Sequence, residues 1–368
     1  MQKKLIAVAV LGACVAGSAL AANVDVYGRI DTGLSYVHQK IGDQAGTDTL
    51  SMDSGMSSGN RWGLKGSEDL GNGYQVGFVL ESGFDADTGK MSKDGLFNRE
   101  ATLRVSGPFG SIYAGRMGRI GSDAGSVGFY AGSVSPFGSG WGEMPGHFAV
   151  TANYDSRYSN ALAYVSPKVG PVTVYAQYTM GNATENESGD NRLFSLGAQA
   201  DFGALQVLGL VEYLNKQSTA VAPNVTHNDS QYDDSYTINL GGSYDFGVAK
   251  VFLAGQYFNA APNFAGQGGD WTESFDGFGV NVGASAPIGA GEFLVSAGYG
   301  KGDYHVGTKD TNRSADSYIF QVGYTYPFSK RTNLYAGAGY HQTTMEEEAS
   351  KDSKTKTTQV MFGLLHKF

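Results

Sequence analysis

The last nine residues of the sequence read Val360-Met361-Phe362-Gly363-Leu364-Leu365-His366-Lys367-Phe368. Apolar residues alternate along this stretch and end on Phe368, with Met361 and Leu365 as apolar exceptions on the polar face. A soluble protein seldom ends on a large apolar residue in an edge strand, because an unpaired edge invites aggregation. In a closed barrel the last strand pairs with the first, and a terminal aromatic ring lies at the membrane interface. We therefore expect an outer-membrane barrel in which Phe368 serves closure and insertion.

The amino-terminal residues have the pattern of a secretory signal. Lys3-Lys4 supplies the positive charge, residues 5–15 form a short apolar core, and Ala19-Leu20-Ala21 matches an A-x-A cleavage site. We therefore expect residues 1–21 to be a signal peptide. Leu11-Gly12-Ala13-Cys14 resembles a lipoprotein cleavage box and is the alternative, but cleavage there would leave a very short apolar region.

Residues 22–368 are expected to form one barrel domain. They hold no cysteine, and no stretch approaches the about 18 consecutive apolar residues that a membrane helix needs. Aromatic residues reach 12%, there are 54 glycines, and mean hydropathy is −0.24. These values suit a membrane barrel, because half of each strand faces water in the lumen. The formal net charge of −9 argues against nucleic-acid binding.

Alternation of apolar and polar residues recurs along the whole of this domain. In the first stretch, Val24, Val26 and Ile30 alternate with Asp25 and Arg29. We count sixteen such stretches, and an even number puts both chain ends on the same side of a closed antiparallel barrel. They begin near Val24, Trp62, Tyr74, Leu96, Gly110, Ala152, Pro171, Arg192, Ala204, Ser235, Ala249, Phe275, Gly291, Ala315, Thr332 and Thr357.

Short and long connections alternate between these stretches. The short ones carry turn residues, as in Gly71-Asn72-Gly73 and Pro167-Lys168-Val169-Gly170-Pro171. This sorting is typical of a transmembrane β-barrel with short periplasmic turns and long extracellular loops. The long connections are polar and irregular, and we expect them at residues 38–55, 182–190, 216–233, 261–274, 302–314 and 345–356.

One further connection, between Met117 and Ala152, is much longer than the rest. It is rich in glycine and carries four interspersed aromatic residues, and loops of this length are usually functional. The aromatic residues give the loop something to bury, so we expect this third loop to fold into the lumen. A disordered surface loop is the alternative. The aromatic residues are Phe129, Tyr130, Phe137 and Trp141.

Charged residues within the strands indicate which face is wet. Arg29, Arg61 and Lys65 fall in phase with polar neighbours and opposite apolar ones. A cation facing lipid at mid-membrane costs about 2–4 kcal/mol, so these three side chains should line the lumen. The alternative is that they pair with carboxylates and only stiffen the wall.

Acidic residues are expected on the opposite side of the pore. Asp123 and Glu143 are the only carboxylates of the long third loop, and Glu81 lies in phase with polar residues of its strand. Cations facing anions across a narrow passage would produce a transverse electric field. As alternatives, Glu81 supports the loop by hydrogen bonding, and Asp123 and Glu143 lie in solvent.

Several motifs resemble the general porins of neisserial and β-proteobacterial type. The most specific is Asn60-Arg61-Trp62-Gly63-Leu64-Lys65-Gly66-Ser67-Glu68-Asp69-Leu70-Gly71, and the resemblance covers essentially the whole mature chain. It implies a sixteen-stranded homotrimeric outer-membrane porin whose third loop narrows the pore. The other matching motifs are Val26-Tyr27-Gly28, Leu80-Glu81-Ser82-Gly83-Phe84, Tyr244-Asp245-Phe246-Gly247, Ser329-Lys330-Arg331-Thr332 and His366-Lys367-Phe368.

The same resemblance adds Arg99 and Arg157 to the basic wall, at positions that match the family's cluster of cations. Arg99 shares its phase with apolar neighbours, so it would need a bulge or a position beyond the apolar band. The chain also departs from the family pattern, since Arg29 stands where a small or apolar residue is common. The family's basic cluster implies a mild preference for anions.

The function expected is therefore a diffusion porin, a water-filled channel for small hydrophilic solutes and ions, with lipid and a homotrimer as its partners. A substrate-specific channel with a site in its lumen is the alternative, and an adhesive barrel would be smaller and plugged. No enzyme, cofactor or metal is expected, because no G-x-S-x-G elbow occurs. The histidines are also scattered without metal-ligand spacing, at His38, His147, His227, His305, His341 and His366.

Overall fold

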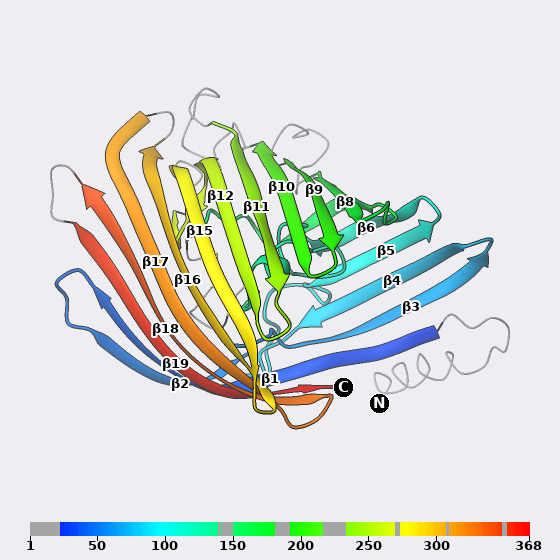
Figure 1. Ribbon diagram of the computed structural model, residues 1–368, viewed down its shortest axis with the longest axis horizontal. Coiled ribbons are helices and arrows are strands. Elements are labelled where there is room, and N and C mark those ends of the chain that lie inside the picture. Colours follow the sequence, from blue (N-terminus) through cyan, green and yellow to red (C-terminus); the bar gives the residue numbers. More distant parts are fainter. Residues whose placement is uncertain are drawn as a thin grey trace, which may run out of the picture.

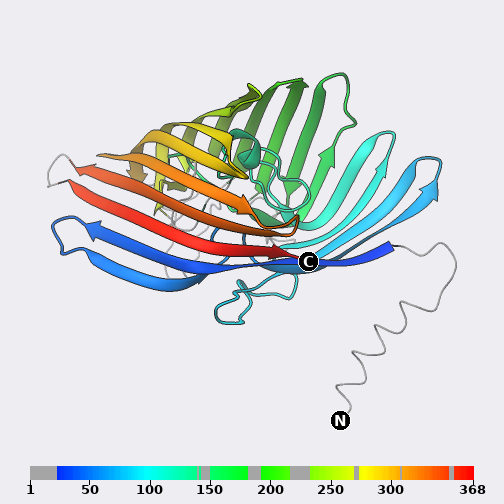
Figure 2. The same cartoon turned by 60° about the horizontal axis from the view of Figure 1, so that its bottom comes forward.

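The computed structural model describes residues 23–138, 141, 150–180, 192–215, 233–268, 273–306, 309–347 and 352–368. These residues form one antiparallel sheet that closes on itself as a barrel, with the infolded loop inside it (Figures 1 and 2). The strands of this sheet are β1 (Asn23–Ile41), β2 (Thr47–Ser54), β3 (Arg61–Gly71), β4 (Tyr74–Gly83), β5 (Glu100–Gly107), β6 (Gly110–Gly118), β7 (Arg157–Val165), β8 (Val172–Thr179), β9 (Arg192–Phe202), β10 (Leu205–Asn215), β11 (Ser235–Asp245), β12 (Lys250–Ala261), β15 (Glu273–Ile288), β16 (Gly291–Val306), β17 (Lys309–Pro327), β18 (Thr332–Glu347) and β19 (Ser353–Lys367).

The second strand of the barrel is interrupted. β2 pairs with the upper part of β1, from Thr32↔Ser54 onwards, and β3 pairs with its lower part, up to Arg29↔Arg61. β2 and β3 are therefore two halves of one strand, separated by residues 55–60. Counted in this way, the seventeen strands of the sheet in the described residues make a barrel of sixteen, as predicted.

The barrel is closed by its two chain ends. β1 pairs with β19 from Arg29↔Lys367 to Ile41↔Thr355. Gly28 and Phe368 then exchange two backbone hydrogen bonds of 3.1 Å, and the Phe368 ring lies over Gly28, where a side chain would collide with it. The last residue thus lies on the seam. A role for Phe368 in membrane insertion stays a prediction.

The two faces of the strands differ as the alternation predicts. Val360, Phe362 and Leu364 are 40–53% exposed on the outer surface of β19. The apolar exceptions Met361 and Leu365 point inward and are buried with residues of the infolded loop. In the described part of the chain, no helix is long and apolar enough to cross a membrane.

Several of the predicted long loops are in fact strand. Residues 38–55 were expected as a loop, but β1 runs to Ile41 and β2 begins at Thr47, so this prediction is wrong. The predicted loops 302–314 and 345–356 are likewise occupied mostly by the extended ends of β16 to β19. These ends are polar because they rise beyond the apolar band, which gives them the composition of loops. Residues 182–190 and nearly all of 216–233 lie outside the described residues.

The connection at residues 261–274 also behaves differently from a surface loop. Its hairpin of β13 (Asn263–Phe264) and β14 (Gln267–Gly268) turns inward, and Phe264 is fully buried. Phe264 forms a bridge with Ala152, at the return of the infolded loop. Phe258, Phe275 and Tyr304 complete this aromatic cluster inside the barrel.

The third loop folds into the lumen, as predicted. We call residues 119–156 the infolded loop; it contains the one-turn helix α2 (Ala131–Val134). Figure 2 shows the loop and its helix within the barrel. All four of its aromatic residues are buried, with exposures of 3–8%, which is why the loop leaves the surface: Phe129, Tyr130, Phe137 and Trp141.

Candidate functional site

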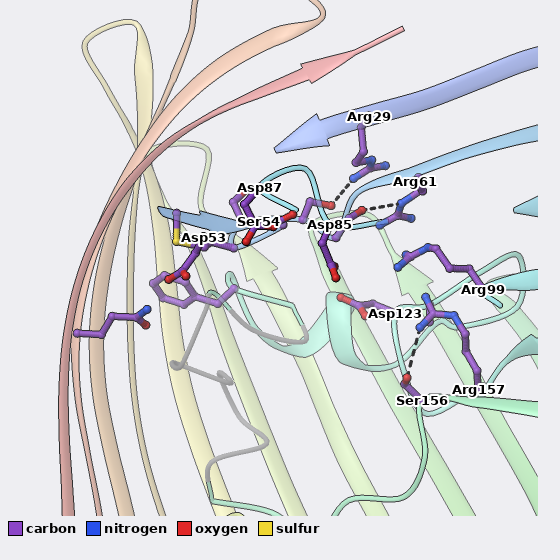
Figure 3. Close-up of a pocket in the computed structure, with 18 residues that line it drawn as sticks. Arg29, Asp53, Ser54, Arg61, Asp85, Asp87, Arg99, Asp123, Ser156 and Arg157 are labelled. Carbon is purple, nitrogen blue, oxygen red and sulfur yellow. Dashed lines mark hydrogen bonds between the residues drawn. The ribbon is translucent and has the colours of Figure 1, made fainter. Parts of the chain in front are cut away.

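A cavity of about 780 Å³ lies in the lumen beside the infolded loop. Four arginines line one side, and four aspartates lie across from them (Figure 3). The arginines come from separate elements: Arg29 from β1, Arg61 from β3, Arg99 from the residue before β5, and Arg157 from the start of β7. The aspartates are Asp53, Asp85, Asp87 and Asp123.

The arginines are held by short contacts to the wall. Arg99 Nε donates to Glu81 Oε1 at 2.7 Å, and Arg61 Nη1 lies 3.8 Å from the same oxygen. Arg61 Nε also donates to the carbonyl of Gly59 at 3.0 Å, and an Arg29 guanidinium nitrogen donates to Ser58 Oγ. Because all four arginines are half-buried, their charges stand at the edge of the water rather than within it.

Glu81 lies among the arginines instead of opposite them. It is only 5% exposed, and it accepts a further hydrogen bond of 3.1 Å from the Tyr27 hydroxyl. One buried carboxylate therefore offsets part of the repulsion between Arg61 and Arg99. The geometry matches the supporting role that the sequence left open as the alternative for Glu81.

Three of the four aspartates lie outside the infolded loop. Asp53 ends β2, and Asp85 and Asp87 lie in the connection between β4 and β5, residues 84–99. The Ala86 amide, between the last two, donates to Ser54 Oγ at 2.7 Å. That bond joins the connection to the end of β2, so that three carboxylates gather on one side. Asp123 is the one aspartate that the infolded loop supplies.

An ion pair anchors the start of the infolded loop. Arg119 and Glu212 of β10 form a salt bridge with side-chain exposures of 5% and 1%. Glu212 also accepts from Ser195 Oγ at 3.0 Å, and Arg119 donates to Asn153 at 3.0 Å. Breaking a buried pair of this kind costs about 3–5 kcal/mol, because one charge is left without a partner.

Side-chain packing fixes the rest of the infolded loop. The Phe129 ring stacks on Tyr175 with centroids 4.0 Å apart, and Trp141 meets Tyr335 edge-on at 5.6 Å. Gln177 of β8 binds the backbone on both sides of residue 119, accepting from the Ile120 amide at 3.0 Å and donating to a carbonyl. Burial raises the pKa of the Tyr130 hydroxyl, with the Glu212 charge adding to it, so the group stays protonated.

The remaining candidate residues lie elsewhere. Lys65 lines a separate space of about 210 Å³ near Asp25 and Arg104, away from the cavity. Glu143 lies outside the described residues. Arg99 precedes β5 instead of belonging to it, which accounts for its irregular phase.

Sequence reasoning missed three of the four aspartates. The signal available was the pair Asp85-Ala86-Asp87, directly after the strand that carries Glu81. Asp53 was hidden within a predicted loop. A charged cavity of this kind can orient and sort small polar solutes. In the described residues no group of three or more His, Asp or Glu side chains could hold a metal ion.

Comparisons with known proteins agree with this architecture. The family model described as Gram-negative porin matches residues 7–345. An outer membrane porin protein of Bordetella pertussis is 32% identical over the full length of both chains. The solved structure of an anion-selective porin from Comamonas acidovorans has a TM-score of 0.64 at 23% identity, covering 94% of this chain and all of its own. A trimer form of OmpT from Vibrio cholerae has a TM-score of 0.58 at 16% identity, covering 92% and 99%.

Proposed function

The chain belongs to the Gram-negative porin family, and from this premise we propose how its channel selects what it passes. The protein is an outer-membrane diffusion porin, a water-filled channel for small hydrophilic solutes and ions. Solutes cross at the cavity between the four arginines and the four aspartates, which gives the channel a mild preference for anions. Relatives in this family are channels rather than enzymes, and we extend that to this chain, which moves solutes without bond chemistry.

The separation of charge across the cavity carries this proposal. Four cations stand on one wall and the carboxylates face them (Figure 3). The Debye length is about 8 Å at physiological salt, so a field across a passage of similar width is only partly screened. The arginines are half-buried, whereas Asp87 and Asp123 are exposed to water, which screens the aspartates more. The balance therefore favours anions, although the formal charge of the whole chain is −9.

The lining favours a general channel over a substrate-specific one. A channel that binds its solute would offer a track of aromatic rings or a dedicated pocket. Among the eighteen residues that line the cavity in the described structure, Phe137 is the single aromatic one. The rest are charged, small or hydroxyl-bearing, apart from Met56.

Assembly and export complete the proposal. We propose a homotrimer embedded in lipid, supported by the trimeric structure among the fold's neighbours and by the apolar outer face. Residues 1–21 are proposed to be cleaved on export, so that the mature chain begins at Ala22. Sequencing the amino terminus of the membrane-extracted protein tests this boundary.

Recordings in planar lipid bilayers test the channel. Purified trimers should insert in steps of three equal openings with ohmic current, and a KCl gradient should give a reversal potential of the sign set by chloride. Silent bilayers with intact trimers would refute the channel. A reversal potential of the cation sign would refute the anion preference alone.

A further inference from the structure

The break in the second barrel strand shapes the cavity more than the infolded loop does. Seven of the eighteen lining residues are consecutive, from Asp53 to Gly59, whereas Asp123, Ala124 and Phe137 are the lining residues from the infolded loop. Residues 55–60, which we call the inward turn, stand between β2 and β3 and leave the plane of the wall. Met56 of this turn is buried against residues such as Phe137 and Trp141.

Asp31 of β1 holds the inward turn from behind. It is fully buried and does not line the cavity. Its Oδ2 accepts the amides of Ser57 at 2.9 Å and Ser58 at 2.7 Å, and its Oδ1 accepts the hydroxyl of Tyr335 from β18. The carbonyl of Asp31 also accepts the Gly55 amide at 2.9 Å. One buried carboxylate therefore satisfies two amides that the broken strand leaves without ladder partners.

Asn60, the first residue of the most specific sequence motif, closes the turn. Its side-chain oxygen accepts the Asp31 amide, and its Nδ2 donates to Ser54 Oγ at 2.6 Å. Ser54 Oγ is the same atom that accepts the Ala86 amide between Asp85 and Asp87. On the other side, Ser58 Oγ accepts from Arg29. The inward turn is thus bonded to both the acidic and the basic sides of the passage.

We propose that Asp31 and Asn60 are positioning residues that set the bore and charge geometry of the pore by fixing the inward turn as a second constriction beside the infolded loop. The proposal rests on the porin function given above. Neither residue is offered as a contact for solute. Both act through Ser57, Ser58 and Ser54, whose groups they bind.

Asp31→Ala is the direct test, with Ser35→Ala as the control. Ser35 is buried on the same inward face of β1 and accepts a hydrogen bond from Gln359, with no contact to the inward turn. We expect Asp31→Ala to change single-channel conductance by at least ~1.5-fold and to shift the reversal potential, since pore diameter and charge placement set both. Ser35→Ala should leave both unchanged. Wild-type channels must conduct in the same bilayers, so failure of the porin function would be recognised separately.

A cysteine reporter distinguishes positioning from mere stability. Ser57→Cys places a thiol on the cavity lining in a chain whose single natural cysteine, Cys14, lies within the predicted signal peptide. In the Asp31→Ala background this thiol should react with a charged methanethiosulfonate reagent at a different rate, whereas a purely stabilising residue would lower the melting temperature and leave the rate alone. Should Asp31→Ala fail to assemble, Tyr335→Phe and Asn60→Ala each remove fewer bonds to the network. Unchanged conductance, reversal potential and thiol reactivity in folded variants would overturn the proposal.

Discussion

The lumen of this barrel has two unlike halves. The wet half, below β1 to β7, holds the cavity with its arginines and aspartates. The packed half, below β8 to β18, is filled by the infolded loop and by the β13–β14 hairpin, which bury clusters of aromatic and aliphatic side chains. Both halves are built from strands with the same alternation. The difference between them lies in the size of the inward side chains rather than in the backbone.

Small inward residues make room for the loop in the packed half. A Cβ atom added to Gly197 would lie 2.6 Å from the Phe129 ring, and one added to Gly323 would lie 2.9 Å from the Trp141 ring. At these two positions the loop packs directly on the backbone of the strand. In the wet half, the inward positions carry long charged side chains instead, and no loop can approach. The pore is therefore placed where the wall is polar and bulky.

The largest effect should come from breaking the anchor of the packed half. Arg119→Ala leaves Glu212 buried without its cation, so we expect a loss of about 3–5 kcal/mol in the free energy of unfolding. Denaturant titration of the purified protein in lipid vesicles measures it. Released from the wall, the infolded loop should also make the conductance noisy.

The exposed pair of Lys168 and Asp201 provides the control for that anchor. Its nitrogen–oxygen distance is 2.9 Å, but the side chains are 53% and 32% exposed. Lys168→Ala should cost less than about 1 kcal/mol, because water screens exposed pairs. Equal losses for Arg119→Ala and Lys168→Ala would show that the buried pair does not hold the loop.

A second effect, smaller than the first, should follow from filling the seat of the loop. Gly197→Val inserts a branched side chain beneath Phe129, and overpacking of this kind costs about 1–3 kcal/mol. We expect a lower melting temperature and a changed conductance as the loop is displaced. Gly255→Val is the matched control, since a Cβ there would have no neighbour within 4 Å. A neutral result for Gly197→Val would mean that the loop is not seated on the strand.

The barrel itself could be predicted from the sequence because alternation is a local property. Strand number, antiparallel closure and the infolding of the aromatic-rich loop all follow from it. The polar ends of strands could not be told from loops, as residues 38–55 show, because a strand that rises beyond the apolar band has no reason to alternate. Met361 and Leu365 broke the alternation for a reason the sequence could not display. Both meet the infolded loop across the lumen.

The candidate site was harder to predict because half of it depends on contacts distant in sequence. The basic wall follows from the phase of Arg29 and Arg61 within their strands. The acidic side depends on a break in the second strand and on the bond between Ser54 and Ala86, which no local pattern announces. Glu81 has the right phase for the lumen but lies behind two arginines, since phase gives a face and not a depth.

Charge removal on the wet half should change selectivity and leave stability nearly intact. A unit charge about 8 Å from the path of a solute is worth about 0.5 kcal/mol in water, or roughly twofold in permeability. Arg61→Ala and Arg157→Ala should each shift the ratio of chloride to potassium permeability towards potassium by about that factor at low salt. Reversal potentials in a KCl gradient measure it. Lys65→Ala, outside the cavity, should shift the ratio less. Unchanged reversal potentials in both arginine variants would remove them from the constriction.

The smallest effect should come from the acidic side. Asp85→Asn removes one of four carboxylates, so the channel should become more anion-selective, by less than the about twofold change expected for an arginine, because bulk water screens these groups more. Asp94→Asn is the control, since Asp94 belongs to the same 84–99 connection but does not line the cavity. If Asp94→Asn shifted the reversal potential as much as Asp85→Asn, the selectivity would arise from the net charge at the mouth. A shift confined to Asp85→Asn would place the acidic side of the field on the connection that Ser54 holds against the broken strand.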